Sequence, residues 1–135
     1  MRFLVIVKAN EESEAGAIPD EAMLAVMGKY NEELAKAGVL LDLSGLQPTS
    51  KGARVAFSGT KRTVIDGPFT EAKELVAGYW LIQVKSKAEA IEWVKRAPFE
   101  EGEVEIRQLF ELDDFEPGEA VDRARELEKK LANKK

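Results

Sequence analysis

The sequence predicts an α+β fold, in which one antiparallel sheet carries two helices on one of its faces. Three observations lead to this prediction. The expected strands and helices follow one another in the order β-α-β-β-α-β, with an additional hairpin. The 135 residues suffice for one domain with one core, and no linker divides them. Two of the expected strands are apolar on both faces, which is typical of a sheet that is covered on both sides.

The first half of the chain begins with a strand over residues 3–7, an unbroken apolar run. We expect a loop over residues 10–18. A helix then opens at Pro19 and ends before Gly38, because proline and acidic residues are favoured in the first turn of a helix and glycine just after the last. The apolar residues of this helix recur at steps of three and four. They are Met23, Val26, Met27, Tyr30, Leu34 and Ala37.

The middle of the chain is expected to be mostly strand. Strands are predicted over residues 39–43 and 79–84, and residues 53–57 and 63–65 resemble the two strands of a hairpin. A short helical turn is expected near residue 71.

The last part of the chain returns to helix, strand and helix. Ser86 and Glu89 form the capping box of a second helix that ends before Pro98. Residues 104–110 alternate in polarity, which predicts a strand. Val104, Ile106 and Phe110 should lie on one face of that strand, and Glu105, Arg107 and Leu109 on the other. A charged amphipathic helix follows over residues 119–131. The whole order is that of the split βαβ, or ferredoxin-like, plan.

Two helices can cover only one face of this sheet, yet the strands over residues 3–7 and 79–84 are apolar on both. The second face is therefore covered either by the C-terminal helix or by another subunit. Because one helix with a narrow apolar stripe cannot hide a whole sheet, a homodimer is the more economical prediction.

Composition excludes several classes of function. The net charge is −5, and the basic residues are dispersed among acidic ones, which argues against binding to nucleic acid or to an anionic membrane surface. The chain has no cysteine and no histidine, so thiol nucleophiles and imidazole bases are excluded. No metal-ligand spacing or phosphate-binding loop is visible, so we predict no metal and no cofactor. With no signal peptide and no run long enough to span a membrane, we expect a cytoplasmic protein.

The most distinctive stretch is residues 64–74, VIDGPFTEAKE, followed closely by Gly78, Tyr79 and Trp80. It resembles the signature of the YCII-related family in its DGPF branch. Further matching segments are KAGVL at 36–40, GLQP at 45–48 and VEIR at 104–107. The resemblance implies a ferredoxin-like domain over residues 1–112 that assembles as a dimeric α/β barrel. It leaves residues 113–135 as a charged helical extension.

The resemblance also implies a site in a cleft beside the sheet, where relatives are proposed to use a His–Asp pair. Because this chain lacks histidine, only the carboxylate carries over, and Asp66 is the residue that matches the motif. Two interpretations of Asp66 stand side by side. Its carboxylate could accept the backbone N–H groups of the turn, or it could act as a general base or ligand anchor.

Four further residues are candidates for binding a substrate. Glu71 and Lys73 form either a solvated surface or a coupled charged cluster beside Asp66. Arg107 either pairs with a neighbouring acid or clamps a substrate carboxylate. Tyr79 either packs in the sheet or lines the same cavity. We predict that Asp66, Arg107 and Tyr79 converge in a cleft within or beside the dimer interface.

Function is left with three alternatives. The first is an enzyme that binds and transforms a small molecule at the dimer interface by carboxylate-based acid/base chemistry. The second is a non-catalytic ligand-sensing module built on the same cleft. The third is a protein-interaction module in which the charged C-terminal helix docks on a partner. The sequence leaves the identity of the ligand open.

Overall fold

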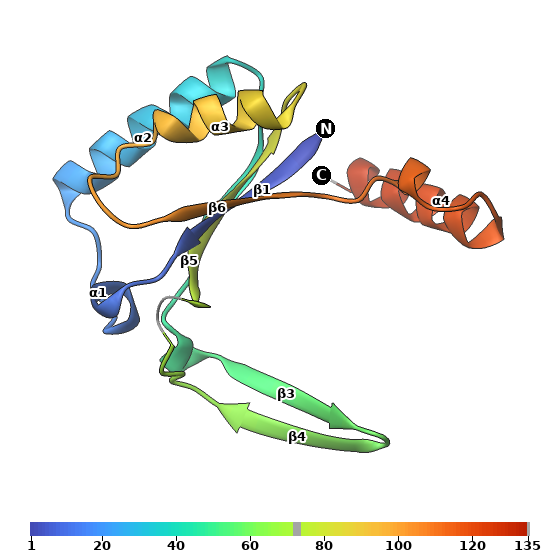
Figure 1. Ribbon diagram of the computed structural model, residues 1–135, viewed down its shortest axis with the longest axis horizontal. Coiled ribbons are helices and arrows are strands. Elements are labelled where there is room, and N and C mark those ends of the chain that lie inside the picture. The colour runs from blue at the N-terminus through green and yellow to red at the C-terminus, as the bar shows by residue number, and fades with distance from the viewer. Residues whose placement is uncertain (72–73, 135) are drawn as a thin grey trace.

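The computed structural model describes residues 1–71 and 74–134. Its centre is a four-stranded antiparallel sheet with the strand order β2-β5-β1-β6. The strands are β1 (Arg2–Lys8), β2 (Leu40–Gly45), β5 (Val76–Gln83) and β6 (Val104–Gln108). Helices α2 (Glu21–Lys36) and α3 (Lys87–Lys95) lie together on one face of this sheet (Figure 1). The predicted α+β, ferredoxin-like fold is thereby confirmed.

Two further parts extend from this body. Strands β3 (Ala53–Ser58) and β4 (Lys61–Asp66) pair with each other in a separate two-stranded sheet, the hairpin. Helix α4 (Glu119–Asn133) follows the last strand. Both reach out on the side of the main sheet that faces away from α2 and α3 (Figure 1). None of the described helices is long and apolar enough to cross a membrane.

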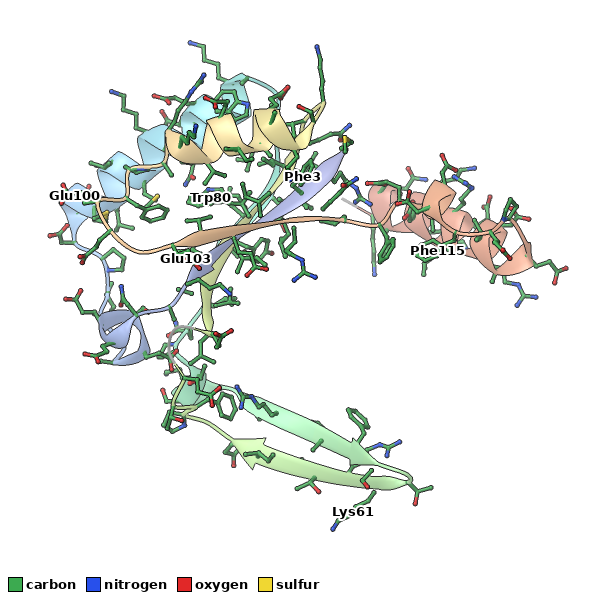
Figure 2. All side chains as sticks on the ribbon, in the orientation of Figure 1. Phe3, Lys61, Trp80, Glu100, Glu103 and Phe115 are labelled. Carbon is green, nitrogen blue, oxygen red and sulfur yellow. The ribbon has the colours of Figure 1, made fainter. Side chains whose placement is uncertain are left out.

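The hydrophobic core lies between the sheet and the two helices. Alternation along β1 and β5 directs every second side chain toward the helices, where it is almost fully buried. Phe3 and Trp80 are examples, and both point toward the helix layer in Figure 2. The other members of the core are Val5, Tyr30, Leu34, Val39, Ile82, Val84 and Ala90, with Val104 and Ile106 packed against them.

The polar atoms of the core have partners. The Trp80 indole N–H donates to the Asn31 amide oxygen at 2.7 Å, and the Tyr30 hydroxyl donates to the Trp93 carbonyl oxygen at 2.7 Å. The rings of Tyr30 and Trp80 meet edge to face at 5.4 Å. Burial raises the pKa of Tyr30 to about 12, because the phenolate form would lose its hydration.

The structure corrects the predicted elements in three places. The expected loop over 10–18 contains helix α1 (Glu11–Glu14), which Asn10 caps. The strand expected from residue 79 already begins at Val76. The last strand ends at Gln108, so Phe110 does not join the core face: it is 75% exposed and stacks on Phe115.

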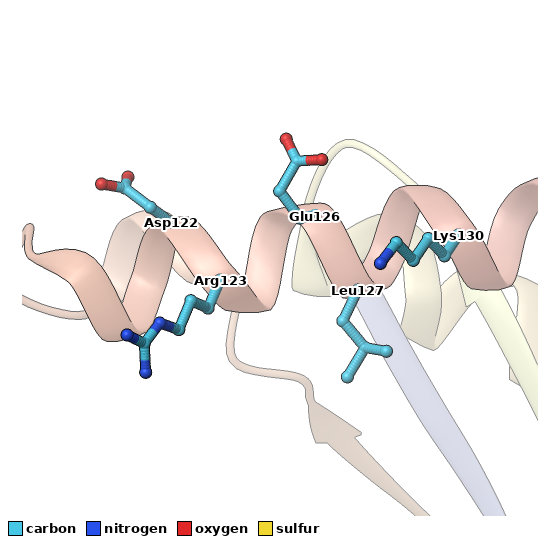
Figure 3. A pocket seen from close by; sticks show the side chains of 5 residues that line it. All are labelled: Asp122, Arg123, Glu126, Leu127 and Lys130. Carbon is cyan, nitrogen blue, oxygen red and sulfur yellow. The ribbon is translucent and has the colours of Figure 1, made fainter.

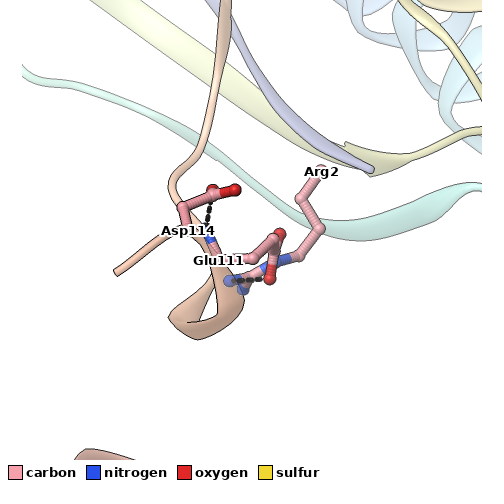
Figure 4. Close-up of polar contacts among 3 residues, drawn as sticks. All are labelled: Arg2, Glu111 and Asp114. Atoms are coloured by element: carbon pink, nitrogen blue, oxygen red, sulfur yellow. Dashed lines mark hydrogen bonds and ion pairs between the residues drawn. The ribbon is translucent and has the colours of Figure 1, made fainter. Parts of the chain in front are cut away.

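The chain leaves the sheet after β6 because polar contacts hold it in a turn. The Glu111 carboxylate accepts two hydrogen bonds from the Arg2 guanidinium, at 2.9 and 3.1 Å. The Glu111 backbone N–H donates to the Asp114 carboxylate at 2.7 Å, at the start of the 3-10 helix η3 (Leu112–Asp114) (Figure 4). These contacts fix the base of the segment that carries α4.

Candidate functional site

The face of the main sheet that α2 and α3 leave uncovered, which we call the helix-free face, has an apolar centre. Directly opposed residues of antiparallel strands share a face. The register pairs Leu4 with Leu81 and Ile6 with Tyr79, and these side chains are half-buried. The helix-free face therefore offers an apolar floor in the middle of the sheet.

Charged side chains from β1 and β6 flank this floor. Arg107 lies opposite Leu4, on the face away from Ile106 and the core, as the alternation predicts. The Glu105 carboxylate lies 3.1 Å from the Lys8 amine and 3.2 Å from the Arg107 guanidinium. The pKa of the Glu105 carboxyl lies below its ordinary value. The larger cause is the hydrogen bond from Lys8, and the next is the hydrogen bond from Arg107.

The two cations of this cluster differ in how much of each is buried. The Lys8 side chain is 17% exposed and the Arg107 side chain 71% exposed. Lys8 thus already supplies a close countercharge for Glu105. Most of the Arg107 guanidinium remains accessible to a second anion, and a guanidinium can bind a carboxylate through two parallel hydrogen bonds.

Tyr79 lies on the same face, on the other side of β1. Its hydroxyl donates to the Asp42 carboxylate of β2 at 3.1 Å, which turns the phenol toward that edge of the sheet. One strand separates Tyr79, opposite Ile6, from Arg107, opposite Leu4, so their backbones are roughly 12 Å apart. A small molecule resting on Leu4 and Ile6 could contact both side chains.

Asp66 lies elsewhere. The prediction that the strand before Asp66 belongs to the main sheet is wrong, because that strand is β4 of the separate hairpin. Among the described residues no hydrogen bond or ion pair joins Asp66 to Arg107 or Tyr79. In the hairpin Asp66 is paired with Ala53, which places it on the same face as Val55 and Val64. A single chain does not bring the three predicted residues together.

The turn after Asp66 is fixed by Thr49. The Gly67 backbone N–H donates to the Gly52 carbonyl oxygen at 3.0 Å, and the Phe69 N–H donates to the Thr49 hydroxyl at 3.0 Å. A Cβ at Gly67 would lie 1.7 Å from the Thr49 carbonyl oxygen, so only glycine fits there. Among the described residues the Asp66 carboxylate accepts none of the N–H groups of this turn, and the interpretation that it caps the turn stays a prediction.

Thr49 is anchored in turn by helix α1. Its hydroxyl donates to one oxygen of the Glu14 carboxylate at 2.6 Å, and its backbone N–H donates to the other at 3.2 Å. The Arg54 guanidinium stacks over the Phe69 ring at 3.7 Å. The DGPF segment thus ties the base of the hairpin to the body, and Asp66 is left exposed.

The remaining predicted residues follow the turn. Glu71 is exposed, and its carbonyl oxygen accepts the Glu74 N–H at 2.9 Å. Lys73 lies outside the described residues. A coupled cluster of Asp66, Glu71 and Lys73 stays a prediction.

Comparison with known proteins bears on this geometry. The family model of the YCII-related domain matches residues 1–113, which include both the helix-free face and the hairpin. The chain belongs to the YCII-related domain family.

Two individual proteins resemble this YCII-related chain. The "Uncharacterized protein R00369" of Rhizobium meliloti (strain 1021) is 31% identical over 116 residues, which are 82% of this chain and 91% of that protein. The 5-chloro-2-hydroxyhydroquinone dehydrochlorinase of Burkholderia phenoliruptrix AC1100, solved in complex with 2,5-dihydroxybenzoquinone, is 14% identical. Its match covers 86% of this chain and 100% of that one, with a TM-score of 0.48.

Surface depressions of this YCII-related chain lie away from the predicted residues. One lies along α4 around Leu127 (Figure 3), and another lies between Val39 and Trp93 at the Met1 end of the sheet. Among the described residues no group of three or more Asp or Glu side chains could hold a metal ion.

Sequence reasoning missed three polar residues that shape the site: Lys8, Asp42 and Thr49. Lys8 could have been found, because alternation along β1 places it on the same face as Leu4 and Ile6. Asp42 could not, since β2 pairs with β5 through an irregular register at this point. Thr49 acts through contacts with Glu14 and Phe69 that no local pattern encodes.

Proposed function

We propose that this YCII-related protein binds a small molecule with an anionic group on its helix-free face, at the interface of a homodimer. One observation carries the proposal. The Arg107 guanidinium is 71% exposed beside the half-buried Leu4, while Lys8 already pairs with Glu105. An accessible arginine at the edge of an apolar floor favours a planar ligand that ends in a carboxylate.

The homodimer is supported by the apolar character of the helix-free face. Leu4, Ile6 and Leu81 stay half-buried within one chain, although neither α2 nor α3 covers them. Two copies that meet through these faces would enclose the floor between two sheets, exclude water from it and strengthen the attraction of Arg107 for an anion.

On this proposal the chemistry rests on Asp66. Its carboxylate is exposed and makes no hydrogen bond with any described residue, so it is accessible to a ligand. A carboxylate that approaches the bound molecule could accept a proton from it as a general base. Tyr79, oriented by Asp42, would donate or accept a hydrogen bond at the other end of the ligand. Glu71 and Lys73 would complete the charged surroundings.

A second candidate is a protein-interaction module. It is favoured by the exposed apolar side chains of the hairpin and of α4, among them Phe57 at 71% and Leu127 at 57% exposure. On this alternative the helix-free face would receive a protein surface and Arg107 would bind one of its acidic side chains.

Calorimetric titration with benzoate and 4-hydroxybenzoate, as probes of the aromatic carboxylate class, tests the proposal. Binding should weaken at least tenfold in Arg107→Gln. Arg96→Gln is the matched control, because the Arg96 guanidinium stacks on Trp93 of α3, on the other side of the sheet. Asp66→Asn should bind the probes and lose only turnover. Equal affinities in the Arg107 and Arg96 variants would contradict the proposal, and no binding of either probe would favour the interaction module.

A further inference from the structure

The hairpin carries an apolar face that its own chain leaves exposed. The register of β3 and β4 places Val55, Phe57 and Val64 on one face, and they are 50%, 71% and 66% exposed. Every residue of both strands is exposed. An isolated two-stranded hairpin is at best marginally stable in water, so this one needs a surface to pack on.

Residues 110–134, which follow β6, also expose apolar side chains. We call this segment the C-terminal arm. Phe110, Phe115, Leu127 and Leu131 are 75%, 48%, 57% and 56% exposed, and no residue of α4 is buried. The arm is held at its base, by the Arg2–Glu111 pair and by an ion pair between Arg125 and Asp113. Leu127 projects from α4 between charged side chains and lines a surface depression with them (Figure 3).

The two segments that carry these apolar surfaces have opposite net charge. Residues 51–66, which form the hairpin and its base, contain four cationic residues and one acidic residue, a net charge of +3. The C-terminal arm contains eight acidic and five cationic residues, a net charge of −3. In a chain whose total charge is −5, this is a strong local asymmetry, and it favours contact between the two surfaces.

Within one chain the two surfaces do not meet. The hairpin and α4 leave the body from different ends of the sheet and diverge, although both project on the helix-free side (Figure 1). No hydrogen bond or ion pair joins them among the described residues. A second copy related by a two-fold axis, however, offers an arm to each hairpin and a hairpin to each arm.

We propose that the hairpin of one copy packs, through Val55, Phe57 and Val64, on the C-terminal arm of a second copy, and that the exchange is reciprocal. The inference rests on the homodimer of the proposed function and adds a contact that a face-to-face pairing of the sheets does not require. Because Asp66 shares the hairpin face with Val55 and Val64, docking also turns its carboxylate toward the second copy.

Cross-linking tests the exchange directly, because the chain has no native cysteine. A Phe57→Cys chain and a Leu127→Cys chain, carrying different tags, are mixed, allowed to exchange subunits and treated with a short bismaleimide. The expected product links one chain of each kind. The matched control replaces Leu127→Cys by Leu24→Cys, since Leu24 is 53% exposed on α2, on the other side of the sheet, and it should give at least tenfold less product.

The cysteine substitutions could themselves weaken the contact between hairpin and arm. The dimer dissociation constant of other variants therefore gives a second, independent test. Sedimentation should show that Phe57→Ser raises the dimer dissociation constant at least tenfold and Leu24→Ser less than twofold. Added salt should weaken the wild-type dimer, because the contact joins opposite charges.

The outcomes separate the two proposals. A wild-type chain that is monomeric at micromolar concentration overturns the homodimer and the exchange together. A stable dimer in which Phe57→Cys links no better to Leu127→Cys than to Leu24→Cys, and in which Phe57→Ser has no effect, overturns the exchange and leaves the proposed function standing.

Discussion

Thr49 rather than Asp66 should hold the DGPF turn in place, and replacing each residue in turn tests this. Thr49→Val keeps the shape of the side chain but removes its hydroxyl. That hydroxyl accepts the Phe69 N–H at 3.0 Å and donates to the Glu14 carboxylate at 2.6 Å. Thr49→Ser is the matched control, because it keeps the hydroxyl and loses only a methyl group.

The expected magnitude follows from the two hydrogen bonds. A neutral hydrogen bond contributes about 0.5–1.5 kcal/mol net, and one to a charged group about 1.5–3 kcal/mol. Because Glu14 and Thr49 are only half-buried, the low ends of these ranges apply, and we expect Thr49→Val to cost about 2 kcal/mol. Thr49→Ser should cost less than about 1 kcal/mol. Asp66→Ala should change the free energy of unfolding by no more than about 0.5 kcal/mol, as at other exposed positions.

Urea unfolding at one fixed protein concentration gives the global values, since dimerisation would make them depend on concentration. Amide hydrogen exchange of Phe69 gives the local one. A loss of about 2 kcal/mol corresponds to an exchange rate roughly 30 times faster. The reasoning fails if Asp66→Ala costs as much as Thr49→Val, because the carboxylate would then be part of the turn.

Three further predictions follow from single contacts. Gly67→Ala should destabilise the protein by about 1–3 kcal/mol or more, because its Cβ would lie 1.7 Å from the Thr49 carbonyl oxygen. Gly52→Ala places a Cβ 3.7 Å from the same oxygen, and equal losses on urea unfolding would contradict the argument. The Tm should fall as the pH rises from about 10 toward about 12. The reason is that the folded state keeps Tyr30 protonated up to about pH 12, whereas the unfolded chain releases that proton near pH 10. The Tyr30→Phe variant should not show this fall in Tm. Since the pKa of Glu105 is lowered in the folded state, its ion pairs stabilise the protein above the ordinary carboxyl pKa of 4.5 and are lost as the pH falls through the lower folded value. Thermal melts of Glu105→Gln between about pH 6 and 3 should show a shallower loss of Tm than wild type.

Local periodicity in the sequence was enough to predict the layers of the fold. Apolar residues at steps of three and four located α2, and the N-cap Ser86 located α3. Alternation in the last strand placed Arg107 on the helix-free face, opposite Ile106. These features depend on residues a few positions apart, which is why a single sequence contains them.

Features that depend on distant contacts could not be predicted in the same way. Alternation in β4 is the same whether that strand joins the main sheet or only β3, so the position of Asp66 was assigned to the wrong sheet. Phe110 continues the alternation of β6, but the Arg2–Glu111 pair ends the strand before it. Both errors arise where side chains far apart in the sequence decide the path of the backbone.

Within the DGPF segment, Gly67 and Phe69 make contacts among the described residues that Asp66 does not make. Gly67 is required because the Thr49 carbonyl oxygen leaves no room for a side chain, and Phe69 because its N–H and its ring both contact neighbouring residues. Asp66 is exposed, and the N–H groups of Gly67 and Phe69 bond to Gly52 and Thr49 instead. Among the described residues the Asp66 side chain makes no hydrogen bond or ion pair, which leaves it accessible to whatever approaches that face of the hairpin. The positive charge around it and the apolar residues beside it favour a second copy with its negatively charged arm, so assembly and any chemistry of Asp66 should be lost together in Phe57→Ser.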